Sequence, residues 1–89
     1  MKVQKDTSNF YIEKEGARAV VEYSLTDELL IIHHTEVPSH MENQGIASTL
    51  LQEAARYAKD NELYIKAECR FAKDYLERKE EYMGLLAKH

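Results

Sequence analysis

The first half of the chain consists of short runs of β-branched and aromatic residues separated by turn residues. Residues 10–14 and 17–25 have this composition, and Glu15-Gly16 between them is typical of a hairpin turn. Residues 29–37 begin with four consecutive apolar residues, which favours a strand covered on both faces. Pro38 ends this run because proline has no ladder donor. The pattern therefore predicts three strands.

Helical periodicity begins after the loop that follows. Residues 46–59 carry Leu50, Ala54 and Ala58 on one apolar stripe, and residues 63–69 have the composition of a fourth strand. Residues 70–83 predict a second helix, which should bury Phe71, Tyr75, Leu76 and Tyr82, pair Asp74 with Arg78 and end at Gly84. The element order is β-β-β-α-β-α, an α/β (α+β) arrangement. A strand–helix–strand connection makes the third and fourth strands parallel, with a possible ligand cleft at their carboxyl ends.

Length and composition limit the class of protein. Eighty-nine residues, 44% of them hydrophobic and 31% charged, predict one domain over residues 1–89, with residues 1–8 as a polar arm. The net charge of −4 weighs against nucleic acid, because such binding depends on clustered Lys and Arg. The longest apolar run, residues 29–32, is too short for a membrane span, and the polar start has no signal-like stretch. We therefore expect a cytoplasmic protein without a membrane partner. A single cysteine suits a reducing compartment.

The turn before the first helix is a candidate anion site. Gln44-Gly45-Ile46-Ala47 combines a glycine, which lets the backbone approach a ligand closely, with the free N–H groups of a helix start. Ser48 and Thr49 could add hydroxyl donors. A glycine here is also typical of a plain turn or cap, and the further glycines of the dinucleotide and P-loop motifs are absent.

Three segments together resemble a known family. His34-Thr35-Glu36-Val37-Pro38, then residues 44–51, then Glu68-Cys69-Arg70-Phe71 are similar in order and spacing to small single-domain N-acetyltransferases of the GNAT type. The resemblance covers about residues 10–86. It implies a shortened GNAT fold, with antiparallel hairpins and a parallel strand 3/strand 4 pair splayed around acetyl-CoA. The protein would be a monomer or a weak homodimer.

The resemblance also implies a set of cofactor-binding residues. In that family the pyrophosphate lies on backbone amides of an Arg/Gln-x-x-Gly-x-Gly/Ala turn, and here Glu42 replaces its first residue, so only the backbone cradle carries over. The pantetheine arm would follow the end of the third strand, where a free N–H could polarise the thioester carbonyl. The implied residues are Glu36, Val37, Pro38, Asn43, Gln44, Gly45, Ile46, Ala47, Ser48 and Thr49.

Three side chains are candidates for catalysis, each with a structural alternative. Cys69 is either beside the acetyl group, as acyl carrier or pocket wall, or a buried small hydrophobe. His34 is either the general base or a histidine hydrogen-bonded within the sheet; His33, one residue earlier, should point to the opposite face. Tyr75 either protonates the departing thiolate, a role that the resemblance implies, or packs as a core aromatic. We expect no metal site, since the His and Cys spacing matches no metal motif.

The sequence thus favours an N-acetyltransferase that moves acetyl from acetyl-CoA to a primary amine, carried by an acceptor that is a small molecule or a peptide. A non-catalytic CoA- or acyl-CoA-binding module, acting as a sensor or partner-binding protein, is the alternative. A small α/β interaction domain in which Gly45 is only a turn is a third possibility.

Overall fold

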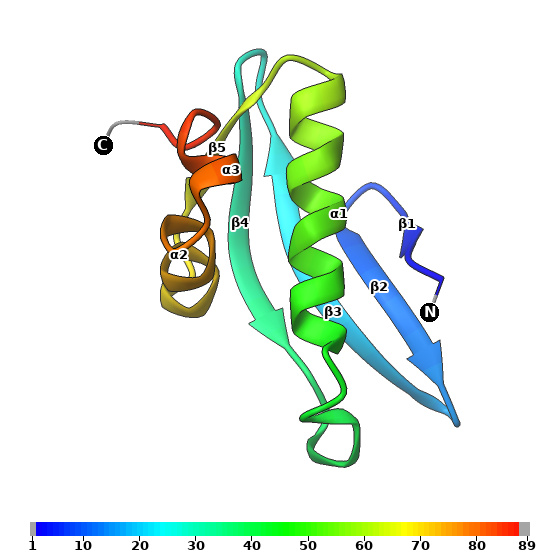
Figure 1. Cartoon of the computed structure of the whole chain (residues 1–89). Coiled ribbons are helices and arrows are strands. Elements are labelled where there is room, and N and C mark those ends of the chain that lie inside the picture. Colours follow the sequence, from blue (N-terminus) through cyan, green and yellow to red (C-terminus); the bar gives the residue numbers. More distant parts are fainter. Residues whose placement is uncertain (1, 88–89) are drawn as a thin grey trace.

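A mixed sheet with strand order β1-β2-β3-β4-β5 forms the base of the protein in the computed structural model, which describes residues 2–87 (Figure 1). Four strands pair as antiparallel neighbours, whereas β5 runs parallel to β4. The strands are β1 (Gln4–Lys5), β2 (Asn9–Lys14), β3 (Ala17–Leu25), β4 (Leu29–Glu36) and β5 (Tyr64–Ala67); the helices are η1 (Ser39–Met41), α1 (Ile46–Asp60), α2 (Arg70–Glu77) and α3 (Glu80–Met83).

One face of the sheet carries the core. Alternate strand residues, such as Val21 on β3 and Ile32 on β4, are fully buried, and α1 lies across β2, β3 and β4 on this face (Figure 1). The helix contributes an apolar stripe at helical spacing that includes Leu50 and Ala54, and α2 adds Ala72. These residues form a single hydrophobic cluster.

The other face of the sheet remains open. Leu29 and Ile31 of the apolar run are only half-buried, so the prediction that β4 is covered on both faces is wrong. None of the helices formed by the described residues is long and apolar enough to cross a membrane.

The parallel pair is short, and this decides the shape of the site. β4 and β5 are paired from Leu29 with Tyr64 to Ile32 with Ala67. One further bond joins the Glu68 amide to the Ile32 carbonyl at 2.9 Å. Beyond this point β4 continues to Glu36, whereas the segment that follows β5 turns away into α2. The parallel third and fourth strands of the prediction are thus confirmed as β4 and β5, with β1 as an added strand within the predicted polar arm, whose Met1 lies outside the described residues.

The C-terminal part differs from the single helix predicted over residues 70–83. α2 ends at Glu77, Lys79 is extended, and the one-turn helix α3 follows, with Gly84 at its end. The chain then reaches the free edge of β5, where the Ile65 amide donates to the Leu85 carbonyl at 2.7 Å and the Ala87 amide donates to the Ile65 carbonyl at 2.8 Å. Pairing this edge satisfies backbone groups that a continuous helix would leave open.

Two side-chain predictions for this region are also wrong. Phe71 was expected in the core but is 53% exposed, because Ala72 and Leu76 form the buried stripe of α2. Asp74 lies 4.0 Å from Arg70, one turn earlier, rather than pairing with Arg78.

Candidate functional site

The loop between β4 and α1 is anchored in the core by one side chain and makes a sharp backbone turn just before α1. Met41 in η1 is fully buried and anchors the loop in the core. Asn43 and Gly45 then have positive φ angles of 64° and 74°, a conformation that favours glycine and asparagine. This pair of left-handed residues directs the chain into α1, so Gly45 is required by the backbone and lies at the N-cap.

The first turn of α1 has backbone donors without internal partners. Its first helical bond runs from the Thr49 amide to the Gly45 carbonyl at 3.0 Å, which leaves the amides of Ile46, Ala47 and Ser48 without an acceptor within the helix. No side chain caps this end, and no acidic residue occupies the first turn. The helix start therefore presents partial positive charge to whatever lies in front of it.

A cavity of about 870 Å³ opens directly onto this helix start. It lies within the size range of small-molecule sites, and its walls combine the end of β4, the loop and the first turn of α1. The lining residues are His34, Thr35, Glu36, Val37, Met41, Glu42, Asn43, Gly45, Ile46, Ala47, Ser48 and Phe71.

The structure brings most of the predicted cofactor residues together here. Glu36, Val37, Asn43 and residues 45–48 line the cavity, whereas Pro38, Gln44 and Thr49 do not. The Thr49 hydroxyl instead donates to the Gly45 carbonyl at 2.8 Å, within its own helix.

The edge of β4 provides a second row of backbone groups. Pairing with β5 ends at Ile32. From residue 33 onward, the edge of β4 that faces away from β3 therefore has no neighbouring strand among the described residues. Residues 34–37 of this edge line the cavity. An extended ligand containing amides can hydrogen-bond to such an edge as an added strand would.

Comparison with known proteins identifies the family. The model of the GCN5-related N-acetyl-transferase family matches residues 9–85. The chain belongs to this family. The NMR structure of a GCN5-like protein from Staphylococcus aureus is similar, with 31% sequence identity and a TM-score of 0.78, covering 97% of this chain and 87% of that chain. A comparison with curated proteins found no match. The GNAT fold predicted from the sequence is confirmed, and this family's fold supports acyl transfer to a small-molecule or peptide acceptor.

Cys69 lies next to a residue that lines this cavity, and it stands at the start of α2 rather than in a strand. It is the N-cap of that helix, and its Sγ lies 3.5 Å from Thr35 Oγ1, which faces the same space from β4. Partial burial raises the pKa of the thiol, but the Thr35 hydroxyl and the backbone amides of Ala72 and Phe71 favour the thiolate by more. The pKa of Cys69 is therefore lower than that of an ordinary cysteine.

Tyr75 connects the two helices that flank the cavity. Ser48 Oγ donates to Tyr75 Oη at 2.8 Å, and Gln52 Nε2 donates to the same oxygen at 3.1 Å. Tyr75 is half-buried and packs against Tyr82 with ring centroids 6.5 Å apart. It does not line the cavity itself but contacts Ser48, which does.

The two adjacent histidines do not point to opposite faces as predicted. A β-bulge on β4 pairs Glu22 with His34 and Tyr23 with Ile32, so His33 has no partner on β3. His34 shares the open face with Glu22, and its Nε2 lies 3.5 Å from Glu36 Oε1. His33 bonds to Ser24 on that same open face. The extra residue of a bulge interrupts the alternation on which the prediction rested.

Sequence reasoning missed two contributors to the site. Phe71 was assigned to the core, yet its exposed ring lines the cavity. Lys14, at the end of β2, donates from Nζ to Gln44 Oε1 at 2.8 Å and places a cation beside the loop. No local signal indicates Lys14, because the contact joins residues 30 positions apart. Among the described residues no Lys or Arg lines the cavity itself. Lys14 therefore reaches the site only through its contact with Gln44 in the loop.

Within residues 2–87 no cluster of three or more His, Cys, Asp or Glu could hold a metal ion.

Proposed function

We propose that the chain binds acetyl-CoA in the cavity at the start of α1 and transfers its acetyl group to a primary amine. One observation supports this most directly. The uncapped first turn of α1 and the unpaired edge of β4 meet in a single cavity of about 870 Å³. A diphosphate attached to an extended chain with amides needs both features side by side.

The residues present fit the two ends of this ligand. The amides of Ile46, Ala47 and Ser48 would hold the pyrophosphate. The space beside Gly45 is open, since a Cβ added there would meet no atom within 4 Å, and glycine leaves this space to the ligand. Lys14 would supply the positive charge that Glu42 does not. The edge from His34 to Val37 would bind the amides of the pantetheine arm.

The proposed chemistry is direct attack of the amine on the thioester, which supplies an activated acyl group. His34 borders the cavity and would take the proton from the attacking ammonium. Tyr75 Oη accepts hydrogen bonds from Ser48 and Gln52, so its own proton is free to be donated to the departing thiolate. Cys69, beside Thr35, would border the acetyl group.

Calorimetric titration with acetyl-CoA, CoA and S-acetylpantetheine tests the binding step. Both nucleotides should bind, and the non-nucleotide thioester should bind much more weakly because it lacks the phosphates. Replacing Lys14 by Gln should weaken nucleotide binding, whereas the control Lys59→Gln, at the far end of α1, should not. Absence of heat with either nucleotide at millimolar concentration would refute the proposal.

If the nucleotides bind, release of the CoA thiol in the presence of an amine library tests catalysis. Turnover should be reduced by His34→Ala. Binding without thiol release for any amine would instead support a non-catalytic CoA-binding module.

A further inference from the structure

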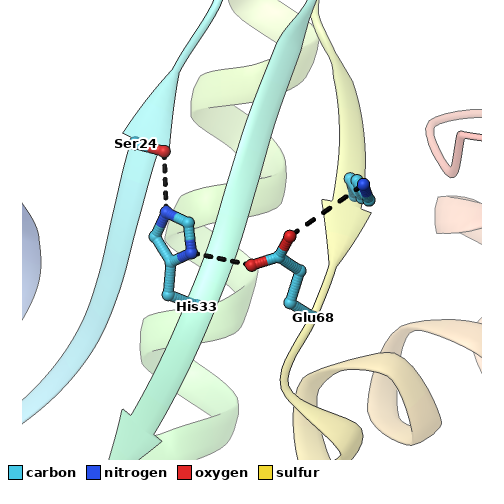
Figure 2. A network of polar contacts seen from close by, with 4 residues as sticks. Ser24, His33 and Glu68 are labelled. Atoms are coloured by element: carbon cyan, nitrogen blue, oxygen red, sulfur yellow. Dashed lines mark hydrogen bonds and ion pairs between the residues drawn. The ribbon is translucent and has the colours of Figure 1, made fainter.

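Three polar side chains form a hydrogen-bonded row on the open face of the sheet. Figure 2 shows Ser24, His33 and Glu68 side by side across three neighbouring strand segments. Ser24 Oγ lies 2.7 Å from His33 Nε2, and His33 Nδ1 lies 2.8 Å from Glu68 Oε1. We call these three residues the polar row. None of them lines the cavity of the proposed acetyl-CoA site.

The backbone holds each member of the polar row in place. Ser24 lies within β3, paired with Ile31. His33 is the extra residue of the β4 bulge, which turns its ring to the open face. Glu68 directly follows β5, and its amide donates to the Ile32 carbonyl at 2.9 Å. Three separate strand segments therefore converge on one imidazole.

The order of the contacts determines what the imidazole can do. An ionised carboxylate only accepts hydrogen bonds, so Glu68 requires the proton of a neutral His33 to be on Nδ1. Nε2 then carries a lone pair directed at the Ser24 hydroxyl. The second Glu68 oxygen lies 3.9 Å from Lys66 Nζ, which helps to keep the carboxylate in position. This is the connection of nucleophile, base and orienting acid that activates a serine.

The polar row is accessible to small molecules. The side chains of His33 and Glu68 are 37% and 45% exposed, and Ser24 is half-buried. A substrate can therefore approach the imidazole directly from solvent, and Glu68 also lines a separate cavity of about 630 Å³ beside β5 and α2. Open access of this kind suits small, reactive acyl compounds.

We propose that Ser24 is an acyl-accepting nucleophile toward small activated esters, with His33 as its base and Glu68 as the residue that orients the base. In the first step Ser24 Oγ bonds to the acyl carbon and the alkoxide or phenolate leaves. The Ser24 proton passes to His33 Nε2 and from there to the leaving oxygen or solvent. In the second step water attacks the acyl-serine, its proton passes to His33, and the Ser24 oxygen leaves and regains a proton. The net reaction is ester hydrolysis, and it is independent of the acetyl-CoA proposal.

The test uses p-nitrophenyl acetate with the full chain carrying Cys69→Ala, so that this thiol cannot react. The rate of p-nitrophenolate release should rise linearly with ester concentration. Peptide mass spectrometry should find the acetyl group on Ser24. The exposed hydroxyls of Ser8 and Ser39, which have no histidine partner in the described structure, serve as internal controls and should remain unmodified.

Variants then separate the roles within the polar row. Ser24→Ala should abolish the adduct, and His33→Gln should slow acetylation of Ser24 by about 100-fold, the low end of general-base effects. Glu68→Gln keeps a hydrogen-bond acceptor and should give an intermediate rate, with circular dichroism confirming the fold of each variant. The proposal is overturned if Ser24 is acetylated no faster than Ser39, or if His33→Gln leaves its rate unchanged.

Discussion

Replacing Gly45 by alanine separates the structural role of this residue from its proposed role in ligand binding. Gly45 has a φ of 74°, and a Cβ added there would meet no atom within 4 Å. The stability cost therefore comes only from forcing a left-handed conformation on alanine, about 1 kcal/mol. For a domain of this size that corresponds to a loss of roughly 4–8 °C in Tm.

The effect on binding should be larger than the effect on folding. Gly45 lines the cavity beside the first turn of α1, and a Cβ there would occupy open space, so we expect the added methyl group to crowd a phosphate bound to these amides. Losing one charge-assisted hydrogen bond to a phosphate costs about 1.5–3 kcal/mol. The Kd for acetyl-CoA should therefore rise roughly tenfold to a hundredfold.

Gly16 provides a matched control in the same chain. It has a φ of 79° in the β2–β3 hairpin, a Cβ there also meets nothing within 4 Å, and it does not line the cavity. Gly16→Ala should lower Tm by a similar amount and leave acetyl-CoA affinity unchanged. Thermal unfolding and calorimetry on both variants test this. Equal acetyl-CoA affinity in both variants and the parent protein would refute the cradle at Gly45.

Two further predictions concern the residues beside the cavity. Thr35→Val removes a hydroxyl that favours the Cys69 thiolate, so the pH midpoint for alkylation by iodoacetamide should rise. Because the folded thiol has the lowered pKa, its contribution to stability is present above the unfolded pKa and is lost as pH falls through the folded pKa; an unchanged midpoint would contradict the assignment. Tyr75→Phe leaves two side-chain donors of α1 without their shared acceptor, and urea unfolding should show a loss of about 0.5–1.5 kcal/mol. Tyr11→Phe, which loses only an exposed contact of 3.5 Å, is the control and should change stability less.

Local patterns in the sequence were sufficient for most elements of the fold. The stripe of Leu50, Ala54 and Ala58 predicts α1, and all three are fully buried. The apolar run from residue 29 predicts β4, and its ending after Glu36 agrees with the position of Pro38. Periodicity is reliable here because these elements pack one face against a single core.

The sequence by itself also predicted the turn at Gly45, because a glycine directly before a helical pattern is typical of a turn or cap, and its φ of 74° agrees with this. Only the tertiary structure decided the rest of the site. The bulge that turns His33 to the open face, the contact of Lys14 with Gln44 and the exposure of Phe71 all depend on segments distant in the chain. The break after α2 has the same cause, since residues 85–87 leave the helix to pair with the free edge of β5. Periodicity reports which face of an element is buried, but it carries no information about the partner that an edge or a side chain meets.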